Sequence, residues 1–333
     1  MSNPHRVLHR FLPLVLLATC ASAQTTPYRY FRAGNAADRA AQVQAGFALM
    51  GGGKDLDEAF RWLCQRAGGG DFLVLRATGN DEYNSYIQGL CPLNSVATVV
   101  IPNADAAHAP FVAEKIREAS GIFIAGGDQA NYINFWMGSP VQAALNDSIH
   151  RSAPIGGTSA GLAVLGEYAY SAQGDKPDDP NLDGKTAIAD PFGSRITLVH
   201  GFLDIPILKG VVTDTHFATR KRMGRLLVFL ARLNPSGETT VRGIGVEQRA
   251  AVLLEPDGQS TVVGHGSAYF IEPTKKPAIL EQGKPLSVAG MEVQKVAPGH
   301  SFNIKEWHGD ATTYTLSIEN GAIQSTQAGG GIY

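Results

Sequence analysis

The stretch APIGGTSAGLAVL, residues 153–165, joins a short apolar run to a helix-length segment through a turn of small residues. Residues 157–161 of it follow the pattern Gly-x-Ser-x-Gly, typical of a tight strand-to-helix turn that pushes a serine hydroxyl out of a sheet. Amides at the start of the helix can stabilise an oxyanion. We therefore interpret Ser159 as a candidate nucleophile; the alternative is an ordinary glycine-rich turn in which Ser159 caps the helix.

Working outward from this stretch, other short apolar runs also end in glycine or polar residues and are separated by helix-length segments. They occupy residues 47–50, 72–75, 96–101, 122–124 and 211–212. Continuous apolar strands that alternate with helices indicate a parallel sheet covered on both faces, with chemistry at the carboxyl ends of the strands. We predict an α/β fold of three layers around a doubly wound, mostly parallel sheet.

The pattern of apolar runs changes near residue 255. Short strand-like runs at 251–254, 261–263, 268–271 and 313–318 are broken by turns such as Pro-Asp-Gly and Glu-Asn-Gly. We predict an α/β domain over residues 24–255, followed by an antiparallel β appendage over 256–333 whose glycines at 329–331 form a frayed tail.

Composition excludes several classes of protein. The 333 residues are 44% hydrophobic and only 17% charged, so a packed core rather than a disordered chain is expected. The net charge is −2, so there is no basic field that would gather nucleic acid. A partner must be recognised locally, at a site.

Residues 1–23 have the layout of a secretory signal peptide. A positive stretch at 5–10 precedes an apolar run at 11–17, and Ala21-Ser22-Ala23 is a cleavage signal, with cleavage after Ala23. The apolar run is too short to span a membrane; alternatives are a membrane anchor, a disordered tail or, more weakly, lipidation at Cys20. We predict a secreted or periplasmic protein without a membrane partner.

Two cysteines, Cys64 and Cys91, remain after such cleavage. In an oxidising compartment a structural disulfide is expected, with two separate buried thiols as the alternative. A metal site is not expected, because ligands at short spacing do not surround them.

His216 lies just after the strand predicted from the apolar run at 211–212, which makes it a candidate base for Ser159. The alternative is a core or capping histidine. Thr219 can cap a helix that runs to Leu233, with Arg220 and Arg222 in its first turn. Cations there oppose the helix dipole by about 0.3–1 kcal/mol each. Their placement therefore indicates a pocket for substrate carboxylates.

Four motifs in order resemble the cyanophycinase and dipeptidase E family of serine peptidases over residues 45 to 255. They are Gly-Gly-Asp-Gln at 126–129, Gly-Thr-Ser-Ala-Gly at 157–161, Asp-x-His-Phe-x-x-Arg-x-Arg-x-Gly-Arg-Leu at 214–226 and Gly-Ile-Gly at 243–245. The resemblance implies a flavodoxin-like fold related to class I glutamine amidotransferases, a serine nucleophile with a histidine base, and no cofactor. It also implies a peptide or poly-aspartate substrate, such as the arginine-bearing polymer cyanophycin, and a homodimer, which the family often forms.

By position, the resemblance makes Ser159 the nucleophile and His216 the general base. It places the amides of Gly127 and Ala160 in the oxyanion hole. It also implies a substrate pocket lined by Gln129, Asp214, Arg220, Arg222 and Arg225.

Two positions depart from the family pattern. Thr215 stands where the family has Gln, so one pocket amide is missing. The family's acid is the Glu of Gly-Ile-Gly-Ile-Asp-Glu, but here Gln248 occupies that position and Glu247 precedes it. A shift of one residue in a strand points a side chain to the opposite face. Glu247 could reach His216 through a bulge, Gln248 could orient the ring without a charge, or Asp214 could help; we prefer Glu247.

These observations predict a secreted serine peptidase that acts on β-aspartyl or poly-aspartate substrates through an acyl-enzyme at Ser159. Two alternatives remain, a catalytically weakened carboxylate-binding or polyanion-binding protein and an esterase or amidase on the same scaffold. Residues 179–190 mimic a calcium loop, but Pro180 and Asp190 fit that motif poorly, and a surface loop over the site is expected.

Overall fold

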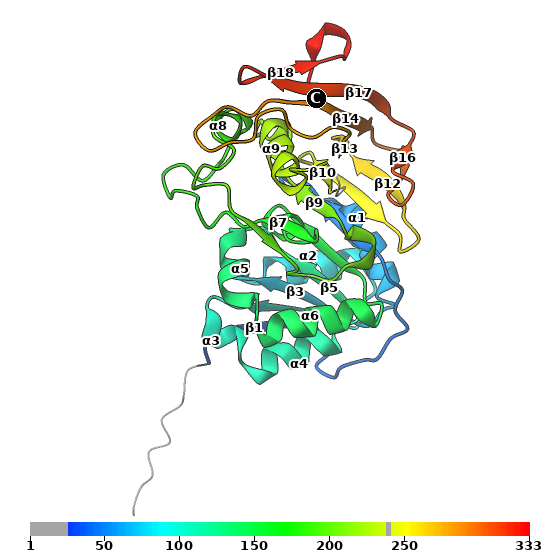
Figure 1. The fold of residues 1–333 in the computed structure, drawn as a ribbon. Coiled ribbons are helices and arrows are strands. Elements are labelled where there is room, and N and C mark those ends of the chain that lie inside the picture. The colour runs from blue at the N-terminus through cyan, green and yellow to red at the C-terminus, as the bar shows by residue number, and fades with distance from the viewer. Residues whose placement is uncertain (1–25, 238–240) are drawn as a thin grey trace, which may run out of the picture.

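The computed structural model describes residues 26–237 and 241–333, which fold into two sheets with flanking helices (Figure 1). The predicted signal peptide and Cys20 lie outside the described residues. In the described part of the chain no helix combines the length and the apolar character needed to cross a membrane.

The first sheet has ten strands, and its centre is parallel. The parallel strands β4, β3, β5, β6 and β2 lie side by side, whereas every other pairing in this sheet is antiparallel. In spatial order the strands are β1 (Arg29–Gly34), β4 (Ser95–Val100), β3 (Asp71–Arg76), β5 (Gly121–Ile124), β6 (Ile155–Thr158), β2 (Phe47–Met50), β11 (Ala250–Leu254), β12 (Gln259–Gly264), β15 (Ser301–Asn303) and β16 (His308–Gly309).

The second sheet has eight strands and is mainly antiparallel. Only β9 pairs in parallel, with β10 on one side and β7 on the other. The order is β18 (Ala322–Ser325), β17 (Thr312–Glu319), β14 (Val288–Val296), β13 (Ala268–Pro273), β10 (Arg242–Val246), β9 (Val211–Asp214), β7 (Tyr168–Tyr170) and β8 (Leu198–His200).

The prediction of one mostly parallel sheet is therefore wrong, although the mixed α/β class is confirmed. The run at 211–212 forms β9 in the second sheet rather than a further strand of the first. The physical reason is local. Helix α7 (Ala160–Ala163) is a single turn, and β7 begins the second sheet five residues after it ends, so the chain leaves the first sheet there.

Alternating side chains of the parallel strands enter two different cores. On β3, Phe72 and Val74 pack with α1 (Asp57–Arg66) and α2 (Glu82–Leu90), while Leu73 and Leu75 face the opposite helices. Those opposite helices are α3 (Ala104–Ala107), α4 (Pro110–Glu118), α5 (Gln129–Trp136) and α6 (Pro140–His150). Helices thus cover both faces of the parallel strands, as continuous apolar strands require.

The C-terminal strands extend both sheets instead of forming a separate appendage. Phe270 of the second sheet stacks on Phe302 of the first, with ring centroids 3.8 Å apart, and Trp307 packs edge-on to both rings. One hydrophobic core holds these residues together with Ile244 and Leu254. The strands are antiparallel as predicted, but residue 255 does not separate two cores.

The other face of the second sheet carries α8 (Gly184–Ala189) and α9 (Met223–Leu233), which pack on Val212 and its neighbours. Two short 3-10 helices, Pro206–Leu208 and Ala328–Gly330, complete the described elements.

The predicted frayed tail is instead tied to the second sheet. The Tyr333 hydroxyl accepts a hydrogen bond from the Met223 amide at 3.0 Å, and its ring packs against Phe217 and Tyr269. The backbone carbonyl of Ile332 accepts a hydrogen bond from Tyr314. These contacts fix the tail behind the start of α9.

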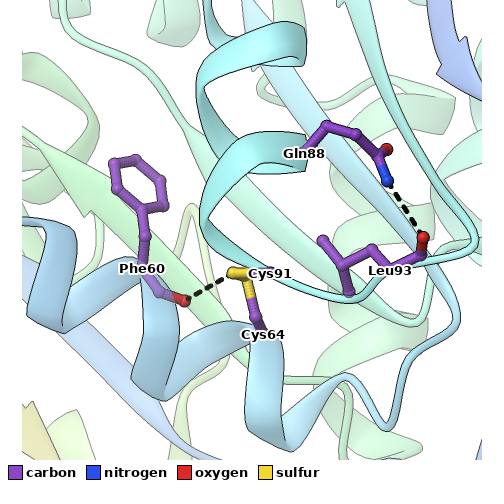
Figure 2. The surroundings of a disulfide bond; sticks show 5 residues. All are labelled: Phe60, Cys64, Gln88, Cys91 and Leu93. Carbon is purple, nitrogen blue, oxygen red and sulfur yellow. Dashed lines mark hydrogen bonds between the residues drawn. A yellow bond between two sulfur atoms is a disulfide. The ribbon is translucent and has the colours of Figure 1, made fainter.

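Cys64 of α1 and Cys91, which follows α2, form a disulfide (Figure 2). Both cysteines are buried. Beside the bridge, the Gln88 side chain donates a hydrogen bond to the Leu93 carbonyl at 3.0 Å (Figure 2). The bridge fastens together the two helices that cover one face of the parallel strands.

Candidate active site

Ser159 lies at the sharp junction between β6 and α7. Its φ of 53° is in the left-handed region, which non-glycine residues rarely adopt and which is typical of functional turns. A Cβ on Gly161 would lie 2.0 Å from the Ile124 carbonyl oxygen, so glycine is required there. The Ser159 side chain makes no capping bond to α7. Its Oγ lies instead 2.7 Å from Nε2 of His216.

His216 follows β9, and its backbone amide donates to the Gly51 carbonyl at 2.8 Å. A Cβ on Gly52 would come within 2.5 Å of the imidazole ring, so the glycine run after β2 lies directly against the base. Ser159 follows a strand of the first sheet, whereas His216 follows a strand of the second. The catalytic pair therefore spans the junction of the two sheets.

The Gln248 side-chain amide lies 2.8 Å from Nδ1 of His216, on the side of the ring opposite Ser159. To accept the serine proton, Nε2 must be unprotonated, so Nδ1 must carry the ring proton. The Gln248 atom at this distance is Nε2, so the amide accepts that proton only when it is flipped to present its oxygen. The three side chains form a candidate Ser-His-Gln triad with an uncharged third member.

Our preference for Glu247 as the triad acid is wrong. The Glu247 carboxylate turns away from His216 and accepts hydrogen bonds from Thr219 and from the Gln248 amide. Strand β10 ends at Val246, and the next two side chains point to different sides of the chain. The alternative in which Gln248 orients the ring describes the contact that is present.

Burial, together with the nearby cations Arg220 and Arg222, lowers the pKa of His216 to about 3. The negative charge of Asp214 raises the pKa of His216, but by less than burial and the cations lower it. The imidazole is therefore neutral at neutral pH, which is the form that a general base needs.

Asp214 and Arg225 do not line the cavity beside Ser159, so their predicted contact with substrate is corrected. Arg225 Nε donates to Asp214 Oδ2 at 2.8 Å, and both side chains are almost fully buried. The guanidinium also lies over the Tyr170 ring. The pair joins β9 to α9 and so helps to fix the end of the strand that His216 follows.

A cavity of about 510 Å³ opens beside Ser159. The predicted residues that line it are Gly127, Gln129, Ala160, Arg220 and Arg222. The amides of Gly127 and Ala160 thus belong to residues at the cavity wall next to the nucleophile, as an oxyanion hole requires.

The cavity also has a wall that sequence reasoning did not assign. Its additional residues are Asp128, Ala172, Asp175, Lys176, Pro177, Pro180, Asn181 and Thr215. Most come from the segment between β7 and α8, which holds the first part of the predicted surface loop; the prediction of a loop over all of 179–190 is wrong, because Gly184–Ala189 form α8. Proline and aspartate in that segment indicated a loop but not which side chains face the site. In the described ranges, no three His, Cys, Asp or Glu side chains form a metal-binding group.

Helix α9 begins at Met223, so the prediction of a helix capped by Thr219 with Arg220 and Arg222 in its first turn is wrong. Arg220 lies in the preceding turn, whereas Arg222 is the N-cap residue of α9 and makes no side-chain capping bond. Arg222 donates to the Thr215 carbonyl at 2.9 Å, to the Thr215 hydroxyl at 3.0 Å and to Asn181 at 3.1 Å. Burial lowers the pKa of Arg222 to about 9, with Arg225 adding to the effect.

Arg220 differs from its two neighbours. Within residues 26–237 and 241–333 its guanidinium forms no ion pair with a carboxylate, although it lines the cavity. Burial and the charge of Arg225 lower its pKa. In the described ranges Arg220 is thus a cation without a direct ion pair beside the candidate nucleophile, although Asp214 opposes the lowering of its pKa.

Comparison with known proteins places these residues in context. Residues 80–192 match the model of peptidase family S51. The chain is 27% identical over 256 residues to cyanophycinases of Synechococcus elongatus and Thermosynechococcus vestitus, covering 73% of each chain. A crystal structure of a peptidase from an acI-B1 Actinobacterium covers 79% of this chain and 98% of its own, with 17% identity and a TM-score of 0.49. The sequence matches, and not this structural overlap, carry the similarity to cyanophycinases.

Proposed function

We propose that this chain, which is similar to cyanophycinases and matches peptidase family S51 over residues 80–192, hydrolyses cyanophycin or related β-aspartyl peptides through an acyl-enzyme at Ser159. The observation that carries the mechanism is the 2.7 Å contact between Ser159 Oγ and His216 Nε2 at the cavity wall. A serine becomes an effective nucleophile only when such a base takes its proton.

In the proposed first step, Ser159 Oγ attacks the scissile carbonyl carbon while its proton passes to Nε2 of His216. The amides of Gly127 and Ala160 stabilise the oxyanion. His216 then gives the proton to the leaving amine, which departs as the acyl-enzyme forms. In the second step His216 takes a proton from water, the hydroxide attacks the ester, and Ser159 regains its hydrogen.

The charges at the cavity wall support an aspartyl substrate. Arg220 and Lys176 can bind carboxylates, and Arg222 adds a third positive charge. Asp128 and Asp175 lie on the same wall, so a substrate that also carries a guanidinium would meet acceptors. A cyanophycin unit has both groups. Because the cavity wall carries both positive and negative side chains, it favours this substrate over a simple ester.

A serine-directed fluorophosphonate tests the chemistry independently of the substrate. We expect wild type and Ser85→Ala to be labelled, since Ser85 is exposed on α2, and Ser159→Ala to remain unlabelled. Incubation with cyanophycin should then release β-Asp-Arg, detected by mass spectrometry. Intact polymer with a probe-reactive protein would remove the substrate assignment.

A second candidate, a carboxylate-binding protein with weakened catalysis, is favoured by one observation. Gln248 is uncharged and stabilises an imidazolium less than a carboxylate would. Failure of the probe to label wild type, together with binding of poly-aspartate in calorimetry, would select this candidate.

We also propose that the protein is exported. The signal-like residues 1–23 and the Cys64–Cys91 disulfide support this proposal. Mass spectrometry of protein from the periplasm or medium should find an N-terminus at Gln24. Full-length protein confined to the cytoplasm would contradict it.

A further inference from the structure

The Glu247 carboxylate connects the two chain segments that flank the base. Its Oε2 accepts the amides of Ala218 and Thr219, the latter at 3.0 Å. Its Oε1 accepts the Thr219 hydroxyl at 2.7 Å and the Gln248 amide at 2.6 Å. Ala218 and Thr219 belong to the turn after His216, while Gln248 contacts the other side of the imidazole.

The surroundings of Glu247 leave its backbone and side chain little freedom. A Cβ on Gly51 would lie 2.0 Å from the Glu247 carbonyl oxygen, and a Cβ on Gly266 would lie 2.9 Å from the Glu247 Cβ. The carboxylate is half-buried. Glycine at these two neighbours therefore permits the close packing in which the carboxylate reaches both segments.

We propose that Glu247 is a positioning residue that fixes the geometry between His216 and Gln248. Its hydrogen bonds hold the turn at 217–219 at a fixed distance from the Gln248 backbone. The carboxylate does not itself pair with the charge on the His216 imidazole. This inference rests on the proposed role of Ser159 as a nucleophile. Glu247, one residue before the expected acid position, thus has a defined structural role.

A carboxylate suits this task for a chemical reason. Each of its two oxygens accepts a backbone N–H, and charge-assisted bonds of this kind are about twice as strong as neutral ones. A glutamine at 247 would place its NH₂ group against a backbone N–H in either orientation of the amide. Glu247→Gln therefore breaks the connection while it preserves the size of the side chain.

The test measures the second-order rate of fluorophosphonate labelling at Ser159. Glu247→Gln should lower the rate about 10- to 100-fold, the range expected when a catalytic group is misplaced by roughly 1 Å. Glu247→Asp keeps both acceptors and should recover part of the loss. The control Glu272→Gln removes a carboxylate that pairs with Arg242 on the second sheet, and it should keep the wild-type rate.

A double-mutant cycle separates positioning from a direct charge effect. If Glu247 acts through Gln248 and the turn, Glu247→Gln should cost much less in a Gln248→Ala background than in wild type. Fully multiplicative losses in the cycle would overturn the proposal. So would a wild-type rate in Glu247→Gln.

Thr219→Val keeps the test decisive if Glu247→Gln does not fold, because it removes only the hydroxyl bond to Oε1. It should slow labelling a few-fold in the wild-type background and cause no further loss in a Gln248→Ala background; an unchanged rate in the wild-type background would overturn the proposal. A wild-type protein that resists the probe would instead indicate failure of the proposed function.

Discussion

His216 has neighbours that do not stabilise its protonated form. Gln248 is uncharged, Arg220 and Arg222 are cations, and burial removes water. The imidazolium that forms during catalysis is therefore costly in the free protein. A substrate carboxylate bound at Arg220 would offset the positive charge next to the ring. The base would then gain strength when a substrate of the right charge is bound.

This arrangement predicts a difference between two pH profiles. Because the pKa of His216 is lowered to about 3, the base form persists above that value and is lost as pH falls through it. The acid limb of kcat/KM reports the free enzyme and should lie well below pH 6.5, while that of kcat reports the complex and should lie at higher pH. Steady-state rates on an aspartyl peptide check this.

The substitution Arg220→Gln should change the pH dependence in a defined direction. Loss of this cation should raise the pKa of His216 and move the acid limb of kcat/KM to higher pH. Arg61→Gln, in an exposed part of α1, is the matched control and should leave the limb in place. A limb unmoved in Arg220→Gln would contradict the electrostatic account.

The contact between Ser159 and His216 was predictable because their signals are local: a glycine pattern between a strand and a helix, and a histidine just after a predicted strand. The third member of the triad was not. Alternation of side chains holds inside a strand, but β10 ends at Val246, so the directions of Glu247 and Gln248 depend on the turn that follows. That turn is shaped by contacts with Ala218 and Thr219, far away in sequence.

Among the elements, β9 and α9 are joined by the buried pair of Asp214 and Arg225. Helix α9 was predicted to start three residues too early because Thr219 is a good capping residue by type. In the structure the Thr219 hydroxyl binds Glu247, and the Lys221 carbonyl accepts the Gly184 amide. Tertiary partners thus hold the backbone of 217–222 outside the helix.

Breaking this buried pair should be costly. Arg225→Met leaves the Asp214 carboxylate buried without its main partner, and we expect a loss of about 3–5 kcal/mol in the free energy of unfolding. Urea denaturation measures it. The double variant Asp214→Leu with Arg225→Met removes both charges and should recover most of the stability; equal losses in both variants would contradict this explanation.

For the whole molecule, the sequence indicated antiparallel strands after residue 255 but not which edges they extend. Alternation within a strand shows that one face is buried, yet it does not identify the partner. Here β12, β15 and β16 extend the first sheet, and β13, β14, β17 and β18 extend the second (Figure 1). Their aromatic residues fill the space between the sheets.

Removal of residues 256–333 should therefore prevent folding rather than yield a free peptidase domain. The truncated chain would expose Ile244 and Leu254 to water and leave β10 without β13. We expect insoluble protein, measured as soluble yield and circular dichroism, with full-length protein as the control. A soluble, probe-reactive fragment of residues 24–255 would show that the α/β part folds alone.

The contact of Tyr333 with the start of α9 has a consequence for the order of assembly. A chain is synthesised from its N-terminus, so Ser159 and His216 exist long before the strands and the tyrosine that brace the histidine-bearing turn. During synthesis, His216 therefore precedes the contacts that fix its turn in the folded protein. Peptidase activity is expected only after the C-terminal strands have been added.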